Sequence, residues 1–349
     1  MSTFHKEVRH NYIEINLNMI NYLPRLISRN VLLQIIVFTT VILSACNPAK
    51  ELFVSTSFRE PANEGLRFVY SENGLQWDSI PGIWLKPEIG TQQVLRDPSI
   101  VRTPNGVFHL VWTTSWKGDL GFGYANSKDL INWSEPQLIP VMKNEPTTVN
   151  VWAPELFYDD EKEEFVVVWA SCIPNRFDLG EEEKENNHRM FYITTKDFKA
   201  ISETKLFYNP GYSSIDAIIV KRGKSDYITV FKDNTRPNRN LKVAFSKSPT
   251  GPYENPSETF TPGFCEGPSV TKVNNEYLIY YDYYRNFIYG ASKTKDFVTF
   301  TDITNQISMP KGHKHGTIFK APASVVNQLK KTYELTSKKA EQPLQISGK

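Results

Sequence analysis

The sequence predicts an all-β fold, a five-bladed β-propeller, preceded by an N-terminal signal peptide and a short tether. Short aromatic and β-branched runs separated by turn residues fill most of the chain. A strand-and-turn pattern also recurs five times, at intervals of roughly 50 to 70 residues. No convincing amphipathic helix appears before Val325–Leu335. This recurrence is typical of four-stranded blades arranged around an axis.

The N-terminal segment has the pattern of a secretory signal. Arg25 and Arg29 precede the uncharged run Val31–Leu43, and the small residues Ser44 and Ala45 follow it. A basic region, an apolar stretch and a small-residue cleavage site together make a signal peptide. The apolar run is shorter than the about 20 residues that a spanning helix needs.

Leu43-Ser44-Ala45-Cys46 resembles a bacterial lipobox, in which Cys46 would be lipidated and become the mature N-terminus. The resemblance implies a lipid-anchored protein of a bacterial cell envelope, on the periplasmic face or the outer-membrane surface. An ordinary signal peptide with an unmodified Cys46 is the alternative, and either Met1 or Met19 is the start. The predicted organisation is a signal segment at 1–46, a flexible tether at 47–60, a propeller at 61–322 and a helical or disordered tail at 323–349.

The expected strands are apolar runs with β-branched and aromatic residues, namely Val107–Thr113, Phe165–Ala170, Tyr227–Phe231 and Tyr277–Tyr281. The repeat consists of a strand, a polar Ser/Thr-Lys-Asp turn and an apolar anchor. Its copies are Gly123–Trp133, Phe191–Phe198, Val243–Pro249, Tyr289–Phe297 and a degenerate one at Phe68–Trp77. Five copies predict five blades.

Composition excludes some partners. The 349 residues include 40 Lys and Arg against 38 Asp and Glu, with no basic stripe, so nucleic acid is not an expected partner. Aromatic residues make up 13% of the chain, which suits a β-rich core or a sugar-binding surface. Three cysteines are too few for a disulfide framework, and none has metal-ligand spacing.

Three acids stand in short apolar or Pro/Gly-bordered segments. Asp97 lies in Arg-Asp-Pro-Ser-Ile, Asp216 in Ser-Ile-Asp-Ala, and Glu266 in Cys-Glu-Gly-Pro-Ser. Glycoside hydrolysis needs a carboxylate that activates water and a carboxylic acid that protonates the leaving group. Because one strand per blade lines a propeller axis, three acids far apart in sequence can converge there.

In this order and spacing, the motifs resemble those of glycoside hydrolase family 43. They are Arg96–Ile100, Val151–Glu155, Ser214–Ala217, Glu266–Ser269 and Gly312–Gly316, within a match from about Arg67 to Ala321. The resemblance implies an inverting glycosidase on a five-bladed propeller that acts on an oligosaccharide or polysaccharide. It implies Asp97 as general base, Glu266 as general acid and Asp216 as the carboxylate that orients the acid and raises its pKa.

The resemblance also implies binding residues. Trp152 and Glu155 match the segment beside the sugar pocket, and Arg285 is a candidate for hydroxyl contacts because it follows the apolar strand after Glu266. No cofactor is required for the chemistry, but His315 matches a histidine that in many members helps to hold a structural Ca²⁺ through water. A buried core histidine is the alternative for His315, as core packing is for Trp152.

Other interpretations stay open at this stage. Asp97 could cap a turn, Asp216 could pair with Lys221 or Arg222, and Glu266 could lie in a loop. The chain could be a non-catalytic glycan-binding lipoprotein, or a retaining fructosidase-like propeller, although that group's Asn-Asp-Pro-Asn segment is missing. Arabinofuranosides, xylosides and galactofuranosides are the expected substrates, with exo-action favoured by analogy.

Overall fold

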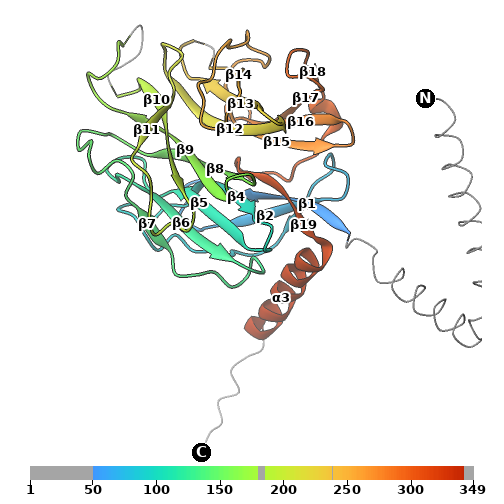
Figure 1. Ribbon diagram of the computed structural model, residues 1–349. Coiled ribbons are helices and arrows are strands. Elements are labelled where there is room, and N and C mark those ends of the chain that lie inside the picture. The colour runs from blue at the N-terminus through green and yellow to red at the C-terminus, as the bar shows by residue number, and fades with distance from the viewer. Residues whose placement is uncertain (1–49, 180–184, 238, 342–349) are drawn as a thin grey trace, which may run out of the picture. The chain divides into compact units, whose positions relative to one another are not determined.

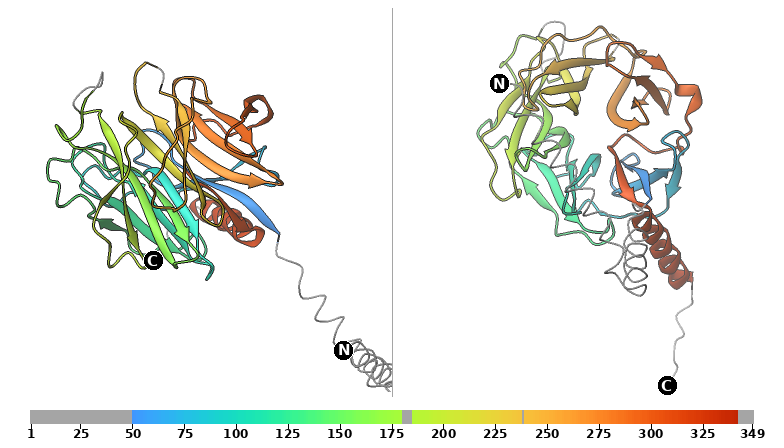
Figure 2. Two further views of the ribbon diagram at one scale, coloured as in Figure 1. Left: turned by 45° about the horizontal axis from the view of Figure 1, so that its top comes forward. Right: turned by 45° about the vertical axis from the view of Figure 1, so that its right-hand side comes forward.

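The computed structural model describes residues 50–179, 185–237 and 239–341 (Figure 1). Glu51 to Pro322 form five antiparallel sheets arranged as blades in a ring (Figure 2, right). The predicted signal segment, with Met1, Met19 and Cys46, lies outside the described residues. Within the described part, none of the helices combines the length and the apolar character of a membrane span.

The blades follow one another along the chain, and the first is closed by both ends of the domain. In that blade the order is β19 (Ile318–Pro322), β1 (Glu51–Ser57), β2 (Arg67–Ser71) and β3 (Asp78–Ile80). The second contains β4 (Arg96–Arg102), β5 (Phe108–Thr113), β6 (Phe122–Ser127) and β7 (Gln137–Ile139). The third contains β8 (Trp152–Asp159), β9 (Glu164–Cys172), β10 (His188–Thr195) and β11 (Lys205–Tyr208).

The fourth blade has three strands, β12 (Ser214–Gly223), β13 (Asp226–Asp233) and β14 (Leu241–Ser246). The fifth contains β15 (Cys265–Val273), β16 (Glu276–Tyr283), β17 (Ile288–Thr294) and β18 (Thr301–Asp302), followed by a 3₁₀ turn at Thr304–Gln306. The first strands of the blades, β4, β8, β12, β15 and β19, contact one another in sequence around the axis. These five are the inner strands.

The repeated turn has a physical cause. At the end of β6, the Ser127 hydroxyl accepts a hydrogen bond from the amide of Leu130 (2.9 Å), whose φ is 63°. Asp129 accepts two more amide hydrogen bonds, from Ile131 and Asn132. Leu130 is thereby turned into the core, where its side chain is fully buried. The same bonds recur at Thr195–Ala200 and Thr294–Thr299 and, with Asn and Gly, at Ser71–Gln76.

The ring is closed by a strand that was predicted to be tether. Residues 51–57 form β1, which pairs antiparallel with β19 from Glu51 opposite Pro322 to Ser55 opposite Ile318. The expected flexible tether at 47–60 is therefore wrong for this part, because its alternating Leu52 and Val54 side chains are buried in the core. The C-terminal strand β19 thus closes the ring on β1, and Arg67 begins β2, the next strand of the same blade.

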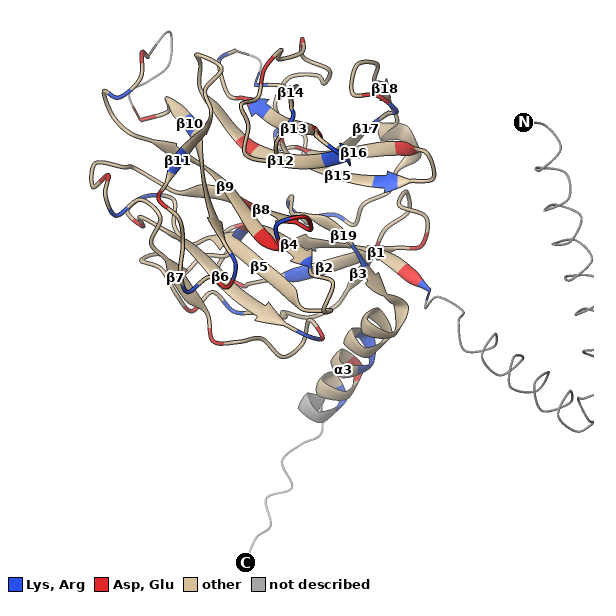
Figure 3. Ribbon diagram, viewed as in Figure 1, with Lys and Arg blue, Asp and Glu red and all other residues tan. Residues whose placement is uncertain are grey.

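Helix α3 (Ala323–Glu341) follows β19 directly, so the described part of the predicted tail is helical. Val326 and Leu329 pack into the core beside β1 and β19. Lys and Arg are interspersed with Asp and Glu along strands and loops (Figure 3), in keeping with the formal net charge of +2.

Candidate active site

Four inner strands carry the same irregularity near their beginnings. A β-bulge interrupts the pairing of β4, β8, β12 and β15, and its first residue has a positive φ in each case. These residues are Asp97 (49°), Ala153 (46°), Asp216 (54°) and Gly267 (56°). Such backbone is unfavourable for most L-residues, and bulges of this kind redirect side chains beside active sites.

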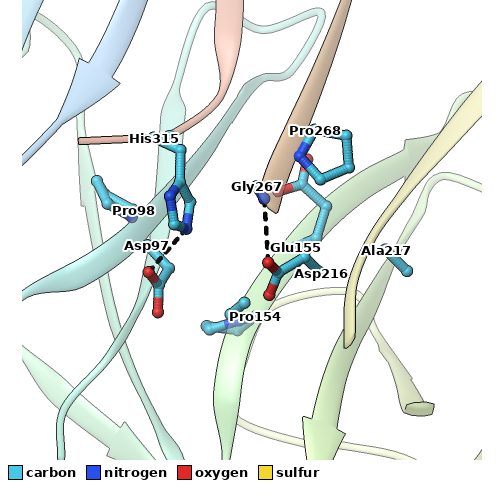
Figure 4. A pocket seen from close by; sticks show the side chains of 11 residues that line it. Asp97, Pro98, Pro154, Glu155, Asp216, Ala217, Gly267, Pro268 and His315 are labelled. Carbon is cyan, nitrogen blue, oxygen red and sulfur yellow. Dashed lines mark hydrogen bonds and ion pairs between the residues drawn. The ribbon is translucent and has the colours of Figure 1, made fainter. Parts of the chain in front are cut away.

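The bulges surround one small pocket at the axis. Its lining comes from four bulges and from the segment before β19, and consists of Asp97, Pro98, Ala153, Pro154, Glu155, Asp216, Ala217, Gly267, Pro268, His315 and Gly316. Asp97 and His315 lie on one side of it, with Asp216 and Gly267 on the other (Figure 4). The structure therefore brings four of the predicted site residues, Asp97, Glu155, Asp216 and His315, into one lining.

Asp97 is held by two donors. The Thr113 hydroxyl donates to Oδ2 (2.8 Å), and Nε2 of His315 lies 3.0 Å from Oδ1. Burial by itself would raise the pKa of Asp97, but the charge of Arg96 and the hydrogen bonds from His315 and Thr113 lower it to about 2. Asp97 is therefore a carboxylate at neutral pH.

Asp216 has the opposite electrostatic environment. Its Oδ2 accepts a hydrogen bond from the Gly267 amide (3.0 Å). Burial raises the pKa of Asp216 to about 6; Lys232 and His315 oppose the shift, and the negative charge of Glu266 adds to it. Asp216 therefore retains a proton in mildly acidic solution.

The suggested pairing of Asp216 with Lys221 or Arg222 is wrong. Lys221 pairs with Asp160 (2.6 Å), and Arg222 pairs with Asp226 (2.9 Å). Both basic residues follow Asp216 on β12, beyond the bulge, and their partners stand in or next to the strand-connecting turns.

Glu266 directly precedes the pocket-lining Gly267 and forms an ion pair with Lys232 (2.9 Å). The Lys232 side chain is 3% exposed and also lies 4.7 Å from the centre of the Tyr284 ring. Sequence reasoning missed the importance of Lys232, although a lysine next to the apolar run Tyr227–Phe231 was a usable signal. Its burial places a permanent positive charge beside two acids.

Glu155 also lines the pocket, and Thr317 Oγ1 donates a hydrogen bond to its carboxyl group (3.1 Å). Burial raises the pKa of Glu155 to about 8, although hydrogen bonds from Ser99 and Thr317 oppose the shift. Glu155 is therefore predominantly protonated at pH 7 and is not a second anionic base.

Potential metal ligands lie around His315. Among the described residues, one group has suitable spacing: Glu266, Asp282 and His315, whose ligand atoms lie within 4.8 Å of one another. Lys232 already pairs with Glu266, and Lys314 pairs with Asp282 (3.1 Å). Calcium prefers six to eight oxygen ligands, whereas this group offers two carboxylates that ammonium groups already neutralise. The set does not fit Ca²⁺.

Trp152 lies beside the pocket-lining Ala153. Its Nε1 donates to the Trp116 carbonyl (2.9 Å), and its ring stacks on His188 with centroids 4.9 Å apart. The Trp116 ring, 44% exposed, meets it edge-on. Trp152 is thus partly buried beside a pocket-lining residue, and sequence analysis did not identify the exposed Trp116.

Arg285 is placed differently from the other candidates. It is exposed in the turn between β16 and β17, and its guanidinium lies 3.4 Å from the centre of the Phe264 ring. It is not among the described residues that line the pocket. Its predicted contact with a sugar therefore depends on a substrate that extends beyond the pocket.

Residues 51–324 match a family described as a probable glycosyl hydrolase domain, which is related to glycoside hydrolase family 43. An α-L-arabinofuranosidase from Bifidobacterium longum subsp. longum is 25% identical over 150 residues. That segment is 37% of this chain but only 14% of the Bifidobacterium protein.

Two solved structures share the fold. An exo-β-1,3-galactanase from Clostridium thermocellum matches with a TM-score of 0.56 and 14% identity, over 77% of this chain and 63% of that one. A thermostable family-43 glycoside hydrolase matches with a TM-score of 0.51 and 14% identity, over 64% and 78% of the two chains. At this identity the structural likeness concerns the fold alone.

Proposed function

The chain belongs to the glycosyl hydrolase family related to glycoside hydrolase family 43, and we propose that it hydrolyses a glycosidic bond with inversion of configuration. The observation that carries this proposal is the position of the three acids. Asp97 and Asp216 occupy equivalent left-handed bulges on inner strands, and Glu266 directly precedes the bulge residue of a third. Strained backbone at acids around one pocket supports a catalytic role over a turn-capping one.

Asp97 is the proposed general base. It is ionised, and Thr113 and His315 fix its orientation. In an inverting reaction it would take a proton from the water that attacks the anomeric carbon. The two catalytic carboxyls of an inverting enzyme stand roughly 6.5–9.5 Å apart, which leaves room for this water.

Glu266 is the proposed general acid, with Asp216 as its neighbour. Repulsion between the two carboxylates helps to keep a proton on this side of the pocket. Protonation of the leaving oxygen consumes that proton, and Lys232 holds the Glu266 carboxylate in place afterwards. The proton taken up by Asp97 returns to solvent before the next turnover.

The proposed substrates are terminal α-L-arabinofuranosyl, β-D-xylosyl or β-D-galactofuranosyl residues of plant-type glycans. The name of one relative, an α-L-arabinofuranosidase, supports a pentose. A solved structure with the same fold is named an exo-β-1,3-galactanase, which supports exo-action and keeps galactose among the alternatives. The neighbouring Trp152 and Trp116 rings would offer apolar faces to further sugar units.

The test uses the detergent-solubilised full-length protein and the three p-nitrophenyl glycosides of these sugars. Turnover of one glycoside, abolished in both Asp97→Asn and Glu266→Gln, is the expected result. Following the anomer of the product by NMR separates inversion from the retention of a fructosidase-like enzyme. Glycan binding without turnover of these glycosides or of arabinan, arabinoxylan and galactan would favour the non-catalytic binding lipoprotein instead.

Anchoring through Cys46 is a separate proposal, which rests on the lipobox-like sequence at 43–46. A Cys46→Ser variant expressed in a bacterial host is expected to move from the membrane fraction to the soluble fraction. Mass spectrometry of the wild-type N-terminus should find a lipidated cysteine. An unmodified Cys46 in a membrane-free protein would refute the proposal.

A further inference from the structure

We propose that Lys314 supplies the cation at the propeller axis, where it holds Asp282 and, through His315, orients Asp97. Lys314 and Asp282 would thus be positioning residues that act on the general base from outside the pocket. This inference rests on the proposed function for its catalytic part only. Its structural part, an axis whose positive charge comes from the protein itself, is independent of any activity.

A continuous chain of contacts leads from the lysine to the base. Nζ of Lys314 lies 3.1 Å from Oδ2 of Asp282. The same oxygen lies 3.5 Å from Nδ1 of His315, and the other ring nitrogen lies 3.0 Å from Oδ1 of Asp97. All four side chains are largely shielded from water, with exposed fractions of 15% for Lys314, 3% for Asp282, 8% for His315 and 11% for Asp97. Charges so placed interact more strongly than surface pairs.

Three different blades contribute to this chain of contacts. Asp282 lies on β16, Asp97 on β4, and Lys314 and His315 in the segment that enters β19. That segment is fixed against the first blade, because the Lys314 amide donates to the Phe58 carbonyl (2.9 Å). The Phe58 ring also meets the His315 ring edge-on, with centroids 5.9 Å apart. The backbone hydrogen bond and the ring contact thus hold this segment in place independently of the ion pair.

The charges at the axis balance without a metal. Along this chain of contacts, Asp97 and Asp282 contribute two negative charges, and Lys314 and protonated His315 contribute two positive ones. A divalent cation among them would face two ammonium groups already bound to the carboxylates it needs. Lys232 and Lys314 therefore supply the positive charge that a metal ion would supply at this position.

The test compares the full-length wild type with three variants, each with EDTA or with millimolar calcium chloride. Lys314→Met removes the charge, Lys314→Arg keeps it, and Lys293→Met removes a partly exposed lysine that pairs with Glu276 at 3.3 Å. We expect kcat of Lys314→Met to fall about 10- to 100-fold with little change in KM, as for other groups that orient a catalytic residue. Lys314→Arg should restore most of kcat, and Lys293→Met should resemble the wild type.

Thermal unfolding gives the second measurement. The wild-type Tm should be the same in EDTA and in calcium, and Lys314→Met should melt below Lys293→Met because Asp282 loses its ammonium partner. A wild type that loses Tm or activity in EDTA and regains it with calcium would overturn the proposal. So would a Lys314→Met variant with the kcat of the wild type. If no glycoside is turned over, the proposed function fails. The Tm comparison alone then still shows whether Lys314 or a metal ion supplies the positive charge at the axis.

Discussion

At the scale of single residues, the site shows how surroundings decide the chemistry of one side chain. Asp97 and Asp216 are the same amino acid at equivalent bulge positions, with φ of 49° and 54°. The pKa of Asp97 is lowered to about 2, since Arg96, His315 and Thr113 outweigh burial. The pKa of Asp216 is raised to about 6, since burial and neighbouring acids outweigh Lys232. One aspartate is suited to accept a proton and the other to retain one.

These two shifts predict a pH profile. Asp97 is ionised at any pH well above about 2, so its titration does not limit activity in mild acid. As the pH rises through about 6, Asp216 loses its proton, and kcat/KM should decline. Measuring kcat/KM between about pH 4 and pH 8 tests this, and Asp216→Asn should move the decline to a different pH as well as lower the rate, because the general acid Glu266 still has to carry a proton. A flat wild-type profile over that range would contradict the prediction.

Glu155 allows a prediction on stability. Its pKa rises from 4.5 in the unfolded chain to about 8 in the fold, so the folded state binds more protons between these values. Wild-type stability should therefore fall as the pH rises from 4.5 towards 8, whereas Glu155→Gln, which cannot ionise, escapes this loss. We expect Glu155→Gln to be more stable by about 1–3 kcal/mol at pH 7.

Urea unfolding of wild type and Glu155→Gln at pH 5 and pH 8 measures this difference. The gap between the two proteins should widen towards pH 8. Equal stability at both pH values would mean that Glu155 ionises freely in the folded state.

At the scale of elements, the bulged inner strand is the unit that builds the site. The motifs Asp-Pro, Ala-Pro, Asp-Ala and Gly-Pro all mark the same bulge, on β4, β8, β12 and β15. Each presents its first residue to the axis in left-handed backbone. Two of the four positions carry an acid, and Gly267 instead supplies the amide that binds Asp216.

Gly267→Ala tests this element. A Cβ there would lie 2.1 Å from Cγ of His315, in backbone at a φ of 56°. We expect a loss of about 1–3 kcal/mol in stability, and displacement of His315 should lower kcat/KM about 100-fold. Unfolding and steady-state kinetics measure both effects.

Gly223→Ala is the matched control, because a Cβ at Gly223 meets no described atom within 4 Å and its φ is not positive. It should behave like the wild type. Equal effects of the two substitutions would show that the bulge glycine has no special role.

At the scale of the whole molecule, the pocket depends on closure of the ring. β19 completes the first blade and continues from His315, so the same short segment closes the fold and supplies a pocket residue. Ser269 Oγ accepts a hydrogen bond from the Ile318 amide (2.8 Å). This bond attaches the segment to the fifth blade as well.

A chain that ends at Lys311 should therefore lose cooperative unfolding, since it leaves β1 as an open edge and removes the β19 contacts to two neighbouring blades. Circular dichroism during heating measures the transition. A control chain that ends at Glu341 retains β19 and α3 and should melt like the wild type. A cooperative transition of the shorter chain at the wild-type temperature would refute the closure argument.

The sequence by itself determined the all-β class, the five blades and the family. The blades follow from a local pattern, since the Ser/Thr–Asp turn folds by hydrogen bonds between residues close in sequence. The family follows from the order and spacing of the bulge motifs. Glu51–Ser57 was misjudged because this strand of mixed polarity lies between β2 and β19, and its partner β19 stands some 260 to 270 positions away in the sequence. The ionic partners Lys232, Asp282 and Lys314 were missed for the same reason. Their role depends on burial and on short distances between side chains of different blades. Only the tertiary structure brings those charges together.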